Sequence, residues 1–259
     1  MVNNSKKLNN QDVLAIDIGG SHIKAVVLNK NGEYISDYQR IETPLASTFE
    51  NIIKAIIDLI KVFPPFDKIA VGFPGYVKDG IIKTAPNLGN NYWAGANLGQ
   101  ALADELQKPV RVVNDADFQG LALINGKGLE MVITLGTGFG TALFMDGALL
   151  PHLELAHLPV RKNKDYDSFV GENALNKEGL EIWNERMKEV LETFKTVINY
   201  DNLFLSGGNA KKLNFKLSKN IQVVSNKDGI KGGASLWQVA ESYSVKTAHP
   251  TQKQLENGN

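Results

Sequence analysis

The chain has 259 residues, 43% of them hydrophobic and 22% charged, the composition of a globular protein with one large domain or two of ordinary size. Lys plus Arg and Asp plus Glu each number 28, so no excess of positive charge predicts a nucleic-acid or membrane-surface partner. The absence of cysteine excludes disulfides, thiol catalysis and Cys-ligated zinc, and it fits a cytoplasmic protein.

Both ends of the chain are polar. Residues 1–12 lack the apolar core of a signal peptide, and no apolar run in the sequence reaches membrane-spanning length. We therefore expect no membrane partner. The polar, aperiodic sequence predicts a disordered N-terminal tail at residues 1–12 and a mobile C-terminal tail at residues 244–259.

The first predicted element is a β-hairpin around a glycine-rich turn. Residues 13–16 form an apolar strand, the sequence DIGGS follows at residues 17–21, and residues 23–28 form a second apolar strand before the turn Asn31-Gly32. Glycines let the backbone turn tightly and leave N–H groups free to face an anion. The turn is therefore a candidate phosphate-binding site.

Strands and helices alternate over the next part of the chain. Ser47 and Glu50 form a capping-box pair that predicts Ser47 as the N-cap of a helix. The polar and aromatic residues of the loop at 87–93 either face a sugar or form a plain loop. The expected elements are a strand at 34–41, a helix at 47–62, a strand at 69–72, a hairpin at Asp79-Gly80, a helix from Asn97 to Gln107 and a strand at 110–113.

The sequence Asn114-Asp115-Ala116-Asp117 follows that last strand and opens a helix expected at 118–124. A carboxylate where a strand ends and a helix begins has a fixed orientation and projects into the cleft at that edge of a sheet. Asp115 is therefore a candidate catalytic residue. The alternative is an N-cap, which accounts for one of these polar side chains but not for three.

A second glycine-rich hairpin repeats the first. Residues 131–133 and 141–145 form its strands, the sequence LGTGFG lies between them at residues 135–140, and Asp146-Gly147 is the following turn. Two such turns facing one another across a cleft would hold a chain of phosphates from both sides. Two ordinary hairpins are the alternative, but neither a P-loop nor a dinucleotide fingerprint is present.

Glu154 and His157 follow the second hairpin in a loop. A Glu and a His three residues apart can hydrogen-bond two neighbouring hydroxyl groups. A metal site is the less favoured interpretation, because no further His or Cys lies at ligand spacing.

The remainder of the chain completes an α/β pattern. The expected elements are helices over 166–199, a strand at 203–205, the turn SGGN at 206–209, a helix near Lys211, a strand at 221–224 and a helix at 233–242. Because hairpins and crossovers alternate, the sheets are expected to be mixed.

Six motifs occur in one order: DIGGSHIKAVV, FPG, NDAD, TLGTGFGTALFMDG, ELAH and LSGGNAKK. Together they resemble the sugar kinases of the ROK family, and most of all its polyphosphate/ATP-glucokinase branch. The resemblance covers residues from about 13 to 237. It implies a two-domain actin-like (ribonuclease-H-like) ATPase fold with a central cleft. The implied domains are an N-terminal α/β domain at 13–113, joined by a returning helix at 234–243, and a C-terminal α/β domain at 114–233.

The resemblance also implies a function: a glucokinase that transfers a phosphoryl group from polyphosphate or ATP to the 6-hydroxyl of glucose, with Mg²⁺ as cofactor and a homodimer as its assembly. Asp115 matches the catalytic base. Sugar-binding positions are matched by Gly75, Asn114, Asp115, Glu154 and His157. Donor-binding positions are matched by Asp17, which lies near Mg²⁺ directly or through water, and by Gly19, Gly20, Ser21, Gly136, Thr137, Gly138, Gly140, Gly207 and Gly208.

The sequence departs from the family pattern at several places. The cysteine-rich zinc loop of many members cannot exist here, so no zinc is expected. Ala156 replaces a usual Gly. Only about twelve residues precede the first strand, so the DNA-binding domain of the family's repressors is not expected. Lys24 is either a further phosphate partner or a solvated surface residue.

Other interpretations remain open. A sugar-binding sensor would have lost Asp17 or Asp115, and both are present; an actin-like assembly ATPase would lack the NDAD and ELxH residues; a kinase for another hexose stays possible. The donor is also open. Arg161, Lys162 and Lys164, with the lysines of 195–231, either form solvated faces or track a long polyanion.

Overall fold

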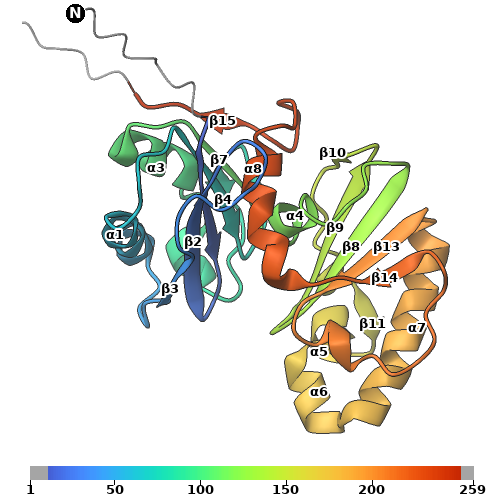
Figure 1. Cartoon of the computed structure of the whole chain (residues 1–259). Helices are drawn as coiled ribbons and strands as arrows, with labels where there is room; N and C mark the ends of the chain where they lie inside the picture. The colour runs from blue at the N-terminus through green and yellow to red at the C-terminus, as the bar shows by residue number, and fades with distance from the viewer. Residues whose placement is uncertain (1–10, 252–259) are drawn as a thin grey trace, which may run out of the picture.

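The computed structural model describes residues 11–251 (Figure 1). Most of the expected N-terminal tail, and residues 252–259 of the expected C-terminal tail, lie outside the described residues. Two β-sheets lie side by side, each with helices against it, as the sequence predicts for a mixed α/β protein. No helix within residues 11–251 combines the length and the apolar character needed to cross a membrane.

The first sheet has six strands in the order β15-β7-β4-β1-β2-β3. Its strands β1, β4 and β7 are parallel, whereas β2, β3 and β15 join antiparallel, so the sheet is mixed. The strands are β1 Val13–Ile18, β2 His22–Leu28, β3 Gln39–Glu42, β4 Lys68–Phe73, β7 Val110–Asn114 and β15 Thr247–Ala248.

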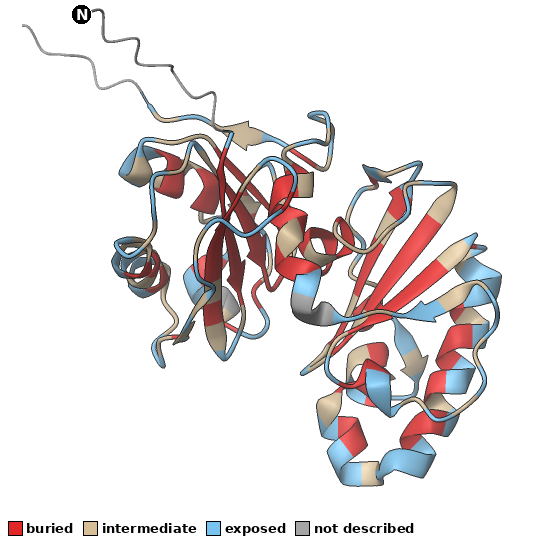
Figure 2. Cartoon of the chain, viewed as in Figure 1, coloured by how far each residue is buried: buried red, intermediate tan, exposed pale blue. Residues whose placement is uncertain are grey.

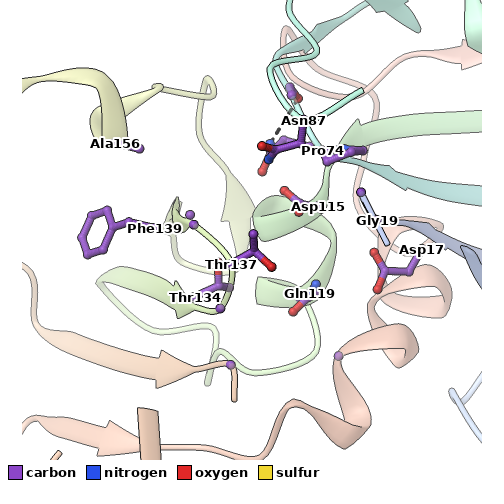
Figure 3. Close-up of a pocket in the computed structure, with 18 of the residues that line it drawn as sticks. Asp17, Gly19, Pro74, Asn87, Asp115, Gln119, Thr134, Thr137, Phe139 and Ala156 are labelled. Atoms are coloured by element: carbon purple, nitrogen blue, oxygen red, sulfur yellow. Dashed lines mark hydrogen bonds between the residues drawn. The ribbon is translucent and has the colours of Figure 1, made fainter. Parts of the chain in front are cut away.

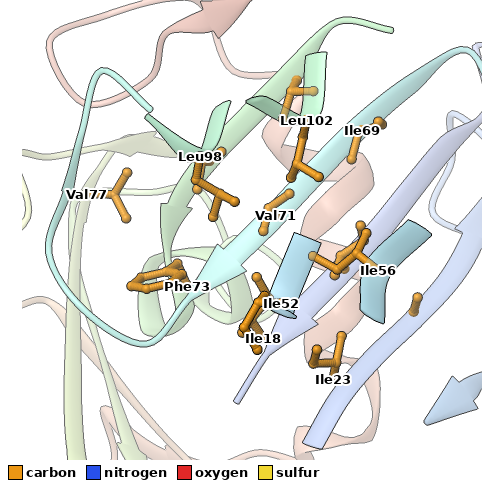
Figure 4. Packing of buried hydrophobic residues seen from close by; sticks show 14 of the residues in the cluster. Ile18, Ile23, Ile52, Ile56, Ile69, Val71, Phe73, Val77, Leu98 and Leu102 are labelled. Carbon is orange, nitrogen blue, oxygen red and sulfur yellow. The ribbon is translucent and has the colours of Figure 1, made fainter. Parts of the chain in front are cut away.

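Helices α1 (Phe49–Ile60) and α3 (Leu98–Leu106) pack on this sheet because each has one apolar face. Ile52, Ile56 and Leu59 of α1 are buried at helical spacing. They meet the central strands, whose apolar residues are buried almost throughout (Figures 2 and 4). Burial on both faces explains why β1 and β4 are continuous apolar runs.

The second sheet has the order β10-β9-β8-β13-β14 and contains the second predicted hairpin. Its strands are β8 Leu129–Leu135, β9 Phe139–Met145, β10 Ala148–Leu149, β13 Asn202–Ser206 and β14 Ile221–Val223. The predicted helical region over 166–199 consists of three helices: α5 Tyr166–Val170, α6 Glu172–Glu178 and α7 Leu180–Ile198.

Two short helices, α4 (Asp115–Gly120) and α8 (Gly232–Leu236), lie between the two sheets (Figure 1). Phe118 of α4 belongs to an apolar cluster that includes Ala15 of the first sheet and Phe144 of the second. Gly233 of α8 comes so close to β1 that an added Cβ would lie 2.6 Å from the Cβ of Ala15. The start of α4 is therefore held at the junction of the two sheets.

The remaining elements are short. They are β5 Val77–Lys78, β6 Ile81–Ile82, α2 Asn90–Trp93, β11 Pro159–Arg161, β12 Lys164–Asp165, and the 3₁₀ helices Leu155–His157, Ala210–Lys212 and Asn226–Lys231.

Three local predictions are wrong. Thr48, not Ser47, caps α1, because its hydroxyl accepts the N–H of Asn51. The strand expected at 34–41 is confined to β3, and the last helix ends at Leu236, since the residues beyond it continue only as turns. Of the two alternatives for the loop at 87–93, Trp93 does not fit the sugar-facing one: it is fully buried in the first core, where its indole N–H donates to the carbonyl of Ser47.

The predicted tail from residue 244 is also wrong for the part that the structure describes. Val245 is fully buried, and β15 pairs with β7 at the edge of the first sheet. The side chain of Gln100 donates to the carbonyl of His249. Pairing covers an edge strand that would otherwise be open, and a two-residue strand is too short to show a period in the sequence.

Candidate active site

A cavity of ≈ 670 Å³ lies between the two sheets and gathers almost all of the predicted site residues (Figure 3). Only Ser21, which is exposed, lies outside its lining. The predicted residues that line it are Asp17, Gly19, Gly20, Lys24, Gly75, Asn114, Asp115, Gly136, Thr137, Gly138, Gly140, Glu154, His157, Gly207 and Gly208.

The first glycine turn joins β1 to β2 and presents Asp17 to the cavity. Asp17 lies opposite Lys24 in the antiparallel register, and Lys24 Nζ is 2.9 Å from Asp17 Oδ2. Burial lowers the pKa of Lys24, but the charge of Asp17 and their hydrogen bond outweigh it, so this pKa lies above its ordinary value. Lys24 is therefore an ion-pair partner of Asp17 at the cavity and not a freely solvated side chain.

The second glycine turn joins β8 to β9 and lies against the start of α4. A Cβ on Gly140 would lie 2.3 Å from Thr134 Oγ1 and 3.1 Å from the Cβ of Ala116, so only glycine permits this approach. The carboxylate of Asp167 accepts the N–H of Phe139 at 2.7 Å and thereby fixes the end of the turn. The turn is thus placed directly beside Asp115.

A third turn, at Gly207-Gly208, adjoins the second. Gly207 has a φ of 94°, and its missing Cβ leaves room for the carbonyl of Leu135. Asn209 donates from its backbone N–H to that carbonyl at 2.9 Å and from its amide to the carbonyl of Gly136 at 3.2 Å. The two turns therefore form one connected wall of the cavity.

Substitution of Gly207 by Ala is expected to lower the free energy of unfolding by about 1–3 kcal/mol, because alanine is strained at this φ and would collide with Leu135. Gly208→Ala is the matched control, since an added Cβ there meets no atom within 4 Å. Urea unfolding of both variants checks this. Equal losses of stability would contradict the role given to Gly207.

Asn114 caps helix α4, whereas Asp115 is the candidate catalytic residue. The Asn114 side chain caps α4 by accepting the N–H of Ala116 at 2.7 Å, and its amide donates to the carbonyl of Gly75 at 3.1 Å. The cap is thus Asn114, which leaves Asp115 to line the cavity. Burial, and then the charge of Asp17, raise the pKa of Asp115 to about 7.

Glu154 and His157 lie at the other end of the cavity, around the 3₁₀ helix Leu155–His157. Burial raises the pKa of Glu154, but the nearby His152, with Nε2 3.5 Å from Oε1, leaves that pKa below its ordinary value. The half-exposed His157 lies with Nδ1 3.3 Å from Asp165 Oδ2 and Nε2 3.9 Å from Glu154 Oε2. The imidazole is thus oriented by a carboxylate on each side.

Several cavity residues were not among the predicted site residues, although five of them lie in segments that the sequence singles out: Pro74, Asn87, Thr134, Phe139 and Ala156. The others are Tyr34, Tyr38, Pro86, Gln119, Asp167, Gly229 and Ile230. His152 was also missed, behind Glu154: its side chain is 6% exposed and its Nδ1 lies 3.0 Å from Asp117 Oδ2. Gln119 could have been found from its spacing, because it follows Asp115 by one helical turn. His152 lies in a loop, where no helical or strand periodicity in the sequence indicates that a residue is buried.

A metal would have to be held largely by its substrate. Within residues 11–251, no group of three or more His, Cys, Asp or Glu side chains could hold a metal ion. Mg²⁺ is commonly bound by one or two carboxylates together with substrate phosphates and water. Asp17, a carboxylate that lines the cavity beside the first turn, fits such a site.

Comparison with known proteins gives consistent matches. The model of the ROK family matches residues 13–163. A polyphosphate glucokinase of Mycobacterium tuberculosis is 30% identical over 222 residues, which is 82% of each chain. A polyphosphate glucokinase of Mycobacterium leprae is 32% identical over 203 residues, 74% of this chain and 62% of that protein.

The fold is also that of a solved sugar kinase. The inorganic polyphosphate/ATP-glucomannokinase from Arthrobacter sp. strain KM superposes with a TM-score of 0.78 at 28% identity, covering 88% of this chain and 100% of that one. The expected actin-like ATPase fold is thereby confirmed.

Proposed function

The chain belongs to the ROK family, and we propose that it is a glucokinase that transfers a phosphoryl group from polyphosphate or ATP to the 6-hydroxyl of glucose. One observation carries the proposal. Asp115 lies in a single cavity together with the glycine turns on one hand and with Glu154 and His157 on the other. A base placed between an anion-binding and a hydroxyl-binding region is the arrangement that phosphoryl transfer to a sugar needs.

Asp115 acts as the general base in this proposal. Its carboxylate accepts the proton of the 6-hydroxyl while that oxygen bonds to the terminal phosphorus and the bond from phosphorus to the donor oxygen breaks. A pKa near 7 suits a base that works near neutral pH. The other product, a donor one phosphate shorter, leaves from the side of the glycine turns.

Sugar hydroxyls are held by the opposite end of the cavity. The Glu154 carboxylate accepts hydrogen bonds, and His157, held by Asp165, exchanges one with a neighbouring hydroxyl. Asn114 contributes through its place between Gly75 and α4, because it fixes both walls around the sugar.

The donor phosphates lie between the two hairpin turns. In the first turn the N–H of Gly19 donates to the carbonyl of His22, and in the second the N–H of Gly136 donates to that of Gly138. The N–H groups of the next residues, Gly20 and Thr137, are therefore the ones that face the phosphates. Asp17 would hold Mg²⁺, which neutralises charge on the phosphates when bound. Lys24, beside Asp17, adds a second positive charge.

Polyphosphate is the donor that we favour, along a path that uses only one of the two basic clusters that the sequence suggested. No member of the cluster Arg161, Lys162 and Lys164 lines the cavity; Arg161 pairs with Glu189, and Lys164 lies 3.8 Å from Glu178. Lys231 also has an acidic partner, Asp228 at 2.9 Å, but it is better placed, because its ammonium lies 5.3 Å from the ring of Tyr34, which does line the cavity. A long polyanion would leave the cavity past Lys231.

A matrix of donors and sugars tests this proposal. With purified protein and Mg²⁺, glucose should be phosphorylated with both polyphosphate and ATP, and kcat/KM for polyphosphate should fall more steeply with salt because more counterions are released. Lys231→Ala should lower kcat/KM for polyphosphate severalfold and that for ATP little, whereas Arg161/Lys162/Lys164→Ala should change neither strongly. Activity with ATP and none with polyphosphate would reject polyphosphate as donor.

The homodimer, the cytoplasmic location and the domain boundaries stay predictions. Each follows from the resemblance or from composition. Size-exclusion chromatography with light scattering would test the dimer.

A further inference from the structure

His152 is an imidazole buried between two carboxylates. Its Nδ1 lies 3.0 Å from Asp117 Oδ2, and its Nε2 lies 3.5 Å from Glu154 Oε1. One face of the ring stacks on Tyr76, with the centroids 5.9 Å apart and the planes at 19°. The side chains of His152 and Asp117 are 6% and 4% exposed, so solvent screens their interaction little.

Negative charge is concentrated around His152, beside the main cavity. Asp115 and Asp117 are two residues apart on α4, and Glu154 approaches from the loop after β10. Burial raises the pKa of Asp117, since an unpaired buried carboxylate is costly, and a cation in contact with Asp117 offsets that cost. Asp17, the other acidic group acting on Asp115, already has its own cation, Lys24.

The other charged and titratable groups nearby do not supply that cation. His157 is half exposed and lies between Glu154 and Asp165. Lys78, which shares a small neighbouring cavity with His152, has its ammonium over the ring of Tyr243 at 4.7 Å. Within the part of the chain that the structure describes, His152 is the basic side chain in contact with Asp117.

We propose that His152 is a positioning residue: as an imidazolium ion it ties Asp117 of the base-bearing helix to Glu154 of the sugar loop, and so holds Glu154 where a sugar hydroxyl can donate to it. The inference rests on the proposed function for its kinetic consequence only. Burial lowers the pKa of His152, but the charge of Asp117, its hydrogen bond and Glu154 outweigh burial and raise the pKa to about 10.

Of the two contacts that His152 makes with carboxylates, the one with Glu154 is the longer. His152 Nε2 and Glu154 Oε1 are buried, and neither has a hydrogen-bond partner among the described residues. Their separation of 3.5 Å exceeds an N–H···O bond by about 0.6 Å, so a small movement of the loop closes it. A sugar that orders the loop would therefore tighten the contact.

Histidine NMR tests the charge without any use of activity. The Cε1–Hε1 signal of His152, assigned by its loss in His152→Gln, should keep the shift of an imidazolium ion from about pH 6 to about pH 8.5. His249→Gln, at an exposed position, should remove a different signal and leave that of His152 unchanged. A His152 signal that titrates with a midpoint below about 7 would overturn the proposal.

Kinetics and binding test the positioning role. His152→Gln should raise the glucose KM and the glucose Kd from calorimetry about tenfold, the usual effect of losing a hydrogen bond to a charged group, and change the donor KM little. His152→Gln/Asp117→Asn should recover part of the loss, because the carboxylate of Asp117 is no longer left buried without a cation.

The outcomes separate this inference from the proposed function. An unchanged glucose KM in folded His152→Gln, or a donor KM raised equally, would overturn it. If His152→Gln does not fold, the double variant and the titration of the wild-type protein decide. If the wild-type protein phosphorylates no sugar, the proposed function fails, whereas the NMR result still decides the charge of His152.

Discussion

Replacement of Asp115 by Asn is expected to lower kcat at least about a hundredfold, the smallest loss typical of removing a general base. The carboxylate is the only change: asparagine keeps the shape of the side chain, and the cap of α4 is made by Asn114. Glucose should still bind, because Glu154 and His157 remain at the other end of the cavity. Steady-state kinetics with calorimetry measures both quantities, and turnover near that of the wild type would show that Asp115 is not the base.

The same substitution should stabilise the protein at neutral and alkaline pH. The pKa of Asp115 is raised from 3.8 to about 7, so the folded state resists ionisation that the unfolded chain undergoes freely. Ionised Asp115 therefore destabilises the folded protein. This destabilisation is absent below pH 3.8, grows as the pH rises, and is complete above about pH 7. Asp115→Asn should therefore raise the free energy of unfolding on the order of 2 kcal/mol at pH 8, with allowance for water in the cavity.

Urea unfolding at pH 4 and at pH 8 measures this difference. The gain of Asp115→Asn should be small at pH 4 and large at pH 8. Equal stabilities at pH 8 would mean that the carboxylate is not desolvated and that its pKa is not raised. Bound Mg²⁺ at Asp17 would lower the pKa of Asp115 by its charge, so these measurements are made without the metal.

Replacement of Asp17 by Asn is the second substitution with a large expected effect. It removes the carboxylate that we propose for Mg²⁺ and that pairs with Lys24. We expect kcat/KM for the donor to fall on the order of 10²–10³-fold, the range for loss of one electrostatic group at a reacting centre. The Mg²⁺ concentration for half-maximal rate should rise, and glucose affinity should not change.

Lys24→Met is the comparison variant for this measurement, since it leaves the Asp17 carboxylate in place without its partner. It should lower the rate less than Asp17→Asn and should not raise the Mg²⁺ requirement. If Asp17→Asn retained a wild-type Mg²⁺ dependence, the metal would have to be held elsewhere, and the assignment of Asp17 would be wrong.

The parts of the fold that the sequence predicts well are those determined by neighbours in the chain. The two glycine hairpins were predicted because strand, turn and strand are contiguous, and both occur as β1–β2 and β8–β9. Asn97 was likewise predicted and found as the cap of α3. Even so, the capping residue of α1 was misplaced by one position, because Ser47 and Thr48 are both good caps.

The parts that escaped prediction depend on contacts between distant segments. His152 and Asp117 are 35 positions apart, and their ion pair forms only because α4 lies at the junction of the two sheets. Trp93 packs in the first core, and its indole N–H finds an acceptor in the carbonyl of Ser47, 46 positions away in the sequence. β15 exists only as a partner of β7. Such features need the fold itself, and no local pattern indicates them.

The central claim, phosphoryl transfer to the 6-hydroxyl of glucose in this cavity, is tested most directly by identifying the product. Wild-type protein and Asp115→Asn are incubated with glucose, Mg²⁺ and either polyphosphate or ATP, and the products are analysed by ³¹P and ¹H NMR. We expect the wild type to form a phosphate monoester coupled to the two protons at C6 of glucose, and Asp115→Asn to form almost none. Donor hydrolysis without a sugar ester, an ester at another carbon, or equal product from both proteins would contradict the account.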